Sequence, residues 1–177
     1  MGVLKNSHVK YLFNCDKCAH QFKSSLDKIN LGRWCPKCVN KTELIIYNYL
    51  YEFCTKVNRE VTFTWCLRKR FDFVIPHLHL IIELDGPSYF QQVSNWGSHE
   101  KTRVNDVYKM KCAFNNGYSI IRIQQEFVFK DKLDWKTMLN SYIKSYENPT
   151  IIFIGDTRYH QHIIDVNFTE NTITHLI

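Results

Sequence analysis

The spacing of apolar side chains along the chain predicts three helices, at residues 41–53, 101–115 and 133–146. In each of them apolar residues recur every three or four positions, which places them on one helical face. Gly117 follows the second helix closely and Pro149 follows the third, and both residue types commonly end helices.

Short runs rich in β-branched and aromatic residues predict strands between these helices. They lie at residues 60–66, 71–75, 79–85, 118–123, 150–155 and 162–168. Helices and strands therefore interleave, which predicts an α/β fold with a mixed sheet flanked by helices. Residues 1–40 read as a small separate module and residues 41–177 as the larger domain, with the strands after about residue 149 as additions to it.

Composition restricts the class of protein. The chain has 177 residues, 45% of them hydrophobic and 15% aromatic, which suits one folded core with a small appendage. A net charge of +6 allows a polyanionic partner but does not require one. Because no apolar run approaches about 20 residues and the N-terminus lacks a secretory pattern, we expect an intracellular protein, in cytoplasm or nucleus, with no membrane partner.

Two C-x-x-C pairs dominate the N-terminal module. Cys15 and Cys18 form the first pair and Cys35 and Cys38 the second, with sixteen residues between them. This spacing predicts a tetrahedral Zn²⁺ site with four thiolate ligands, which would be structural because no coordination position stays open. A redox C-x-x-C pair, or His20 in place of one cysteine, are the alternatives.

The second cysteine pair directly precedes a predicted helix, which resembles a treble-clef finger more than a two-hairpin zinc ribbon. Basic and aromatic residues surround the four cysteines and are candidates for contacts with phosphates and bases. Those expected to contact nucleic acid are Lys17, Lys23, Arg33, Trp34 and Lys37. An ordinary solvated surface is the equally weighted alternative.

Three acidic residues interrupt the apolar strands at 71–75 and 79–85. In a hairpin that pairs Ile75 with Leu80, Asp72 lies opposite Glu83, with Cβ atoms about 5 Å apart, and Asp85 falls on the same face as Glu83. Carboxylates that close repel each other unless a divalent cation reverses the interaction. The pattern therefore predicts a Mg²⁺ or Mn²⁺ site.

Simpler explanations exist for two of these acids. Asp85 and Gly86 suit a turn, and Asp72 could pair with Arg68 or Arg70. Neither explains Glu83 inside an apolar run.

The segments RFDFVIP, LIIELDG and NNGYSIIRI, in this order, resemble the PD-(D/E)xK nuclease superfamily, in particular its very-short-patch-repair-like and homing-endonuclease-like branch. The resemblance covers about residues 41–125 and implies a restriction-endonuclease-like fold. It also implies that Asp72 and Glu83 hold the catalytic metal beside Asp85, and that Glu43 in the first helix has a role. Glu43 could instead complete a helix-capping box with Asn40.

The chain departs from the family pattern at two positions. Asp85 stands where the superfamily often has lysine, and Tyr89 stands near the position where relatives often have histidine. Asp106 and Lys109 share a helical face and could supply the missing groups, or form an ordinary surface ion pair. Arg122 could contact a phosphate or pair with an acid of the core.

Together these features predict a metal-dependent DNA endonuclease whose zinc finger aids DNA binding, with structural Zn²⁺ and catalytic Mg²⁺ or Mn²⁺. By the resemblance, its products would carry 5′-phosphate and 3′-hydroxyl ends. A non-catalytic zinc-finger DNA-binding protein on a decayed nuclease fold is the alternative, and a zinc-stabilised protein-interaction module is the third.

Overall fold

The computed structural model describes residues 8–16, 19–30, 35–36, 41–54, 56–86, 99–132, 134–168 and 173–176. The chain forms two compact units, Met1–Leu44 and Ile45–Ile177. This boundary lies four residues beyond the one predicted from sequence, inside helix α2 (Lys41–Phe53).

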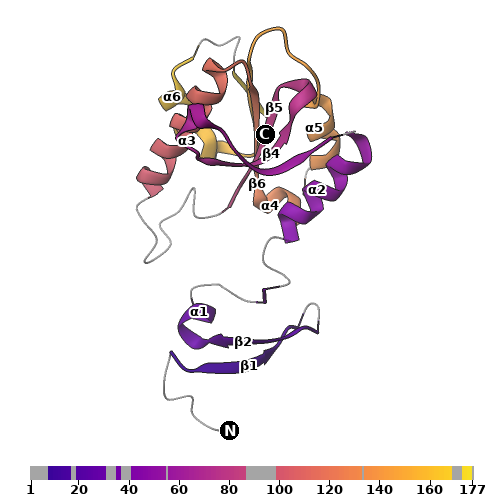
Figure 1. Cartoon of the computed structure of the whole chain (residues 1–177), viewed down its shortest axis with the longest axis vertical. Helices are drawn as coiled ribbons and strands as arrows, with labels where there is room; N and C mark the ends of the chain where they lie inside the picture. The colour runs from indigo at the N-terminus through magenta and orange to yellow at the C-terminus, as the bar shows by residue number, and fades with distance from the viewer. Residues whose placement is uncertain are drawn as a thin grey trace. The chain divides into compact units, whose positions relative to one another are not determined.

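The smaller unit is built on a two-stranded antiparallel sheet of β1 (Lys10–Asn14) and β2 (Gln21–Ser25), followed by the short helix α1 (Leu26–Asn30) (Figure 1). Its described core consists of Cys15, Phe22 and Cys35, with Phe13 packed against them. A core this small buries too little apolar surface to stabilise a fold by itself, so the unit needs another source of folding free energy.

The larger unit contains a six-stranded sheet in the order β3-β4-β5-β6-β7-β8. The first three strands pair antiparallel, and β5 to β8 pair parallel. Their bounds are β3 Asn58–Thr62, β4 Arg70–Ile75, β5 Leu80–Asp85, β6 Ser119–Gln124, β7 Ile151–Ile154 and β8 Ile173–Leu176. Strands β5, β6 and β7 are buried along their whole length, as parallel strands covered on both faces are.

Helices cover both faces of this sheet (Figure 1). Helix α2 and helix α5 (Trp135–Tyr142) pack on one face through Leu50 and Leu139. Helices α3 (His99–Asn115) and α6 (His160–Val166) pack on the other through Met110 and Val166. The short helix α4 (Gln125–Phe129) follows β6. None of the described helices has the length and apolar character needed to span a bilayer.

The expected mixed α/β architecture is confirmed, and the predicted helices at 41–53 and 101–115 match α2 and α3 closely. The predicted strand at 162–168 is wrong, because this segment lies mainly in helix α6. His162 and Val166 are buried one helical turn apart while Ile164 is exposed, so a helical apolar face was mistaken for a strand.

Two other boundaries differ from the prediction. Strand β3 ends at Thr62, because the 3₁₀ helix η1 (Thr64–Cys66) takes the rest of the expected strand. The predicted helix at 133–146 is shorter, since α5 ends at Tyr142.

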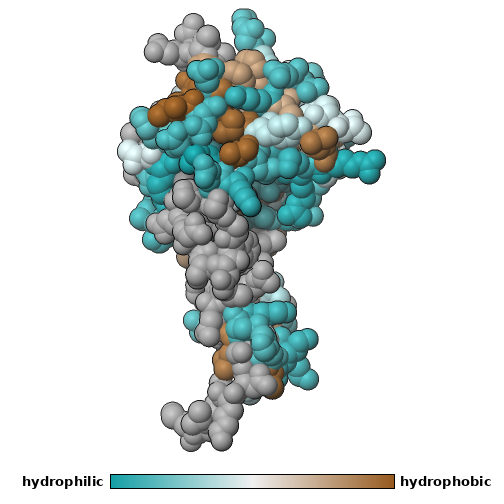
Figure 2. All heavy atoms as spheres, turned by 90° about the vertical axis from the view of Figure 1, so that its left-hand side faces the viewer, coloured by the Kyte–Doolittle hydropathy of each residue, from teal (hydrophilic) through white to brown (hydrophobic). Residues whose placement is uncertain are grey.

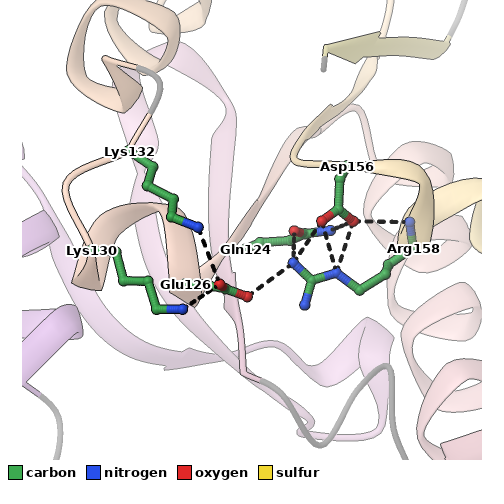
Figure 3. A network of polar contacts seen from close by, with 6 residues as sticks. All are labelled: Gln124, Glu126, Lys130, Lys132, Asp156 and Arg158. Atoms are coloured by element: carbon green, nitrogen blue, oxygen red, sulfur yellow. Dashed lines mark hydrogen bonds and ion pairs between the residues drawn. The ribbon is translucent and has the colours of Figure 1, made fainter.

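A polar network joins the carboxyl ends of β6 and β7 to α4 (Figure 3). Arg158, on the 3₁₀ helix η4 (Thr157–Tyr159), donates to Oε1 of Gln124 at 2.7 Å and to Oδ2 of Asp156 at 2.7 Å. These bonds lower the pKa of Asp156 to about 2. Arg158 also reaches Oε2 of Glu126 at 3.2 Å, and Glu126 in turn pairs with Lys130 and Lys132.

The Gly155→Ala substitution should destabilise this corner. An added Cβ would lie 2.5 Å from Cδ of Gln124, a side chain that is buried and held by Arg158 and Asp156. We expect a loss of about 1–3 kcal/mol in the free energy of unfolding, measured by chemical denaturation. In a Gln124→Ala background the clash is gone, so the additional loss should largely vanish; an undiminished loss there would contradict the explanation.

Candidate active site and zinc site

The β4–β5 hairpin has the predicted register, but its ladder ends before the expected pair of Asp72 and Glu83. Ile75 pairs with Leu80, and the ladder continues to Phe73 and Ile82. Beyond this pair, the backbone N–H of Leu84 donates to Oδ2 of Asp72 at 2.9 Å. The Asp72 carboxylate therefore takes the place of a backbone acceptor at the end of the ladder, which fixes it against β5.

Glu83 is buried on β5, and helix α3 supplies its partner. Nζ of Lys109 lies 2.7 Å from Oε1 of Glu83 and also 4.7 Å from the ring centroid of Phe71. The pKa of Glu83 is raised to about 8, chiefly by burial and in part by the nearby Asp72, while Lys109 acts in the opposite direction. Burial likewise raises the pKa of Asp72. Nearby positive charges therefore offset only part of the free-energy cost of ionising these two buried carboxyl groups.

Asp85, expected as a third metal ligand, points to a different partner. Arg122 donates from Nε to Oδ2 of Asp85 at 2.8 Å and from Nη2 to Oδ1 at 2.5 Å, and the Tyr159 hydroxyl donates to Oδ2 at 2.8 Å. Arg122 lies on the adjacent strand β6 and is completely buried, so its charge requires a buried anion. Asp85 supplies that anion, and the expectation that it holds metal is corrected to a role in fixing Arg122.

Arg122 itself is therefore not placed to contact a phosphate of DNA, which corrects that expectation too. The alternative, pairing with an acid of the core, is what the structure has. Although burial lowers the pKa of Arg122, Asp85 and Asp106 raise it well above its ordinary value.

Asp106 and Lys109 share a face of α3, as predicted, but they are not a surface ion pair. Both are buried. Oδ1 of Asp106 lies 3.2 Å from Nη2 of Arg122, and Oδ2 lies 3.8 Å from Nε2 of His162 on α6. Against the effect of burial, Arg122 and His162 lower the pKa of Asp106.

We call these residues the acid cluster: Asp72, Glu83, Asp85, Lys109, Asp106, Arg122, Tyr159 and His162. It holds four carboxylates and two side chains, Lys109 and Arg122, that carry full positive charges. Among the described residues, no group of three or more His, Cys, Asp or Glu side chains is arranged to hold a metal ion. Asp85 and Asp106 neutralise Arg122, Glu83 pairs with Lys109, and Asp72 lies on the strand next to that of Glu83.

Tyr159 and His162 were missed as members of the cluster. His162 lies in the segment predicted as a strand at 162–168, and Tyr159 lies between that segment and the predicted strand at 150–155. Both residues lie more than 70 residues after Asp85 in the chain, and predicting a strand at 162–168 hid the helical turn that brings His162 to the cluster.

Several expected site residues lie elsewhere. Glu43 is half-buried in the first turn of α2 and belongs to the smaller unit, so its catalytic role stays a prediction. Lys23 is exposed on β2. Outside the described residues lie Lys17, Cys18, Arg33, Trp34, Lys37, Cys38, Asn40 and Tyr89.

Two of the four cysteines of the predicted zinc site lie in the described part of the chain. Cys15 and Cys35, one from each C-x-x-C pair, are both buried in the core around Phe22. Their thiols, brought together from distant positions, suit a tetrahedral ion of the Zn²⁺ type.

Comparison with known proteins supports the same assignment. A family model described as a "probable treble clef zinc finger domain" matches residues 1–41. The N-terminal unit is thus zinc-finger-like, and zinc is the metal that this family indicates. No curated protein and no solved structure matches the chain.

Substituting the described cysteines should release zinc. We expect one zinc ion per wild-type chain by atomic absorption, and its loss in Cys15→Ser and Cys35→Ser, because three thiolates bind the ion far more weakly than four. Cys54→Ser, which alters a buried cysteine of the larger unit, is the matched control and should keep the metal. Full zinc content in the Cys15→Ser protein would contradict the assignment.

The raised pKa of Glu83 makes stability depend on pH. Between the ordinary value of 4.5 and about 8, the unfolded chain ionises Glu83 while the folded chain keeps its proton, so unfolding becomes progressively easier as pH rises. Without added magnesium or manganese, Glu83→Gln should therefore raise the melting temperature relative to wild type at pH 8, by the equivalent of about 2 kcal/mol or more, but not at pH 5.

The exposed Glu60, paired with Arg70 at 3.1 Å, provides the control for this comparison. Glu60→Gln should leave the difference in melting temperature between pH 5 and pH 8 as it is in the wild type. The explanation fails if Glu83→Gln shifts the melting temperature equally at both pH values.

Proposed function

We propose that the larger unit is a metal-dependent DNA endonuclease, with the zinc finger assisting DNA binding. One observation carries the proposal: within one buried cluster, the pKa of Asp106 is lowered by its cationic neighbours, whereas the pKa values of Asp72 and Glu83 are raised. Structural ion pairs lower the pKa of their acids, so these two are the candidates for a function that needs an added cation. The resemblance of this part of the sequence to PD-(D/E)xK nucleases points to the same pair.

Each residue has a role in this proposal. Asp72 and Glu83 would hold Mg²⁺ or Mn²⁺, which when bound activates water and stabilises the leaving oxygen in phosphodiester hydrolysis. The Leu84 N–H keeps the Asp72 carboxylate oriented. Lys109, whose ammonium lies beside Glu83, would offset negative charge on the phosphate as it is attacked. Asp85, with Arg122 and Tyr159, would keep β5 and β6 in place beneath the site.

A non-catalytic DNA-binding protein is the second candidate. It is favoured by the partial neutralisation inside the cluster, where Arg122 and Lys109 already pair with carboxylates. In that case the cluster would be a structural ion-pair core and the zinc finger would carry the function.

Plasmid cleavage separates the two candidates. With Mg²⁺ or Mn²⁺, the full chain should nick supercoiled DNA, and Asp72→Asn, Glu83→Gln and Lys109→Met should each reduce the rate by about 10²–10³ because each removes a charge that acts in the transition state. Glu60→Gln, on the exposed side of β3, should cleave like wild type.

Equal nicking by wild type and the Asp72→Asn and Glu83→Gln proteins would identify a contaminating nuclease and refute the proposal. Salt-dependent DNA binding without any cleavage would instead establish the second candidate.

A further inference from the structure

The turn between β3 and β4, residues 63–69, packs Cys66 into the core but exposes Leu67 and Arg68. Leu67 is 74% exposed, the largest exposed fraction among the large apolar side chains of the described residues. Leu67 and Arg68 both have left-handed backbone, with φ of 48° and 56°. Left-handed backbone in two consecutive non-glycine residues is unfavourable, and here it turns a leucine into solvent.

Basic side chains surround this apolar tip. Arg68, Lys69 and Arg70 follow Leu67 directly, and residues 61–71 contain no acid. Arg68 is exposed, and Nζ of Lys69 lies 5.8 Å from the ring centroid of Tyr108 on α3. Arg70 is partly neutralised by Glu60. The turn therefore presents a concentrated positive charge around one leucine.

The turn is anchored next to the acid cluster. Its 3₁₀ helix η1 packs against α3, the helix that carries Lys109, and Cys66 shares a core with Met110. At its other end the turn runs directly into β4, two residues before Asp72. Figure 2 shows the face of the larger unit that carries α3 and α6, where single apolar side chains interrupt a hydrophilic surface.

We propose that this β3–β4 turn is a DNA-contacting element of the larger unit, in which Arg68 and Lys69 bind backbone phosphates and Leu67 contacts the sugar and base edges between them. This inference rests on the proposed function, because it assigns the substrate contact of the same site. The positive charge of the turn favours DNA over a second copy of the chain as the binding partner. A second copy docking symmetrically would bring Arg68 and Lys69 against their own counterparts, whereas duplex DNA offers a line of phosphates. Apolar wedges flanked by basic residues are a known means of contacting DNA grooves.

The test measures binding of the full chain to a labelled duplex of about 20 base pairs at several salt concentrations, by fluorescence anisotropy without added Mg²⁺ or Mn²⁺. The Arg68→Asn/Lys69→Gln double variant should bind at least about tenfold more weakly and lower the slope of log K against log salt by about 1.8, since two phosphate contacts are lost. Asn is chosen at position 68 because it tolerates left-handed backbone. Leu67→Asn should weaken binding several-fold without changing the slope.

Lys136→Gln/Lys144→Gln is the matched control. It removes the same charge from exposed lysines on or just after α5, which covers the opposite face of the sheet, and it should bind like wild type. Equal affinity and slope in the turn variant and this control would overturn the inference. So would turn-dependent binding to anionic lipid vesicles with no binding to the duplex.

The inference and the proposed function can fail separately. Binding that depends on the turn, in a protein that never cleaves DNA with Mg²⁺ or Mn²⁺, would uphold the contact and refute the nuclease. If the protein cleaves DNA but substitutions at residues 67–69 do not change duplex binding, the nuclease is upheld and the DNA contact of the turn is refuted.

Discussion

The larger unit depends on the neutralisation of one buried guanidinium. Arg122 is completely buried in the centre of the sheet, where an uncompensated charge costs several kcal/mol. Asp85 from β5 and Asp106 from α3 neutralise it, and Tyr159 of η4 donates to Asp85. Four segments far apart in the chain are thereby held in one arrangement. Removing either carboxylate would leave part of that charge unpaired, which typically destabilises a protein by about 3–5 kcal/mol.

This constraint also determines which acids remain for chemistry. Strand β5 pairs antiparallel with β4 and parallel with β6. The first residues of β4 and the last residues of β5 and β6 therefore lie along the same edge of the sheet, the one formed by the carboxyl ends of the parallel strands. Open α/β sheets bind ligands at the carboxyl ends of their parallel strands. At this edge Arg122 engages Asp85 and Asp106, while Asp72 and Glu83 lie with Lys109 next to α3.

The sequence predicted local features of this site well and distant ones poorly. The helices α2 and α3 and the Ile75–Leu80 register follow from spacing within a few residues. The partner of Asp85 could not be predicted in this way, because Arg122 lies 37 residues further along the chain and the sequence does not give the order of the strands in the sheet. For the same reason, Tyr159 and His162 were not predicted as members of the cluster, and the strand expected at 162–168 assigned His162 to the wrong type of element.

Burial alone does not explain why the acids of the cluster differ. Asp106 and Glu83 are both almost inaccessible, yet the pKa of Asp106 is lowered and that of Glu83 is raised. The difference lies in their neighbours: Asp106 has Arg122 and His162, whereas Glu83 is favoured as an anion by Lys109 and Arg122 but opposed by the negative charge of Asp72. A fold under selection for stability alone would favour an apolar side chain at position 83, since buried ion pairs are often replaced without loss. The carboxyl at this position, beside Asp72 and paired with Lys109, is the feature on which the proposed cation site rests.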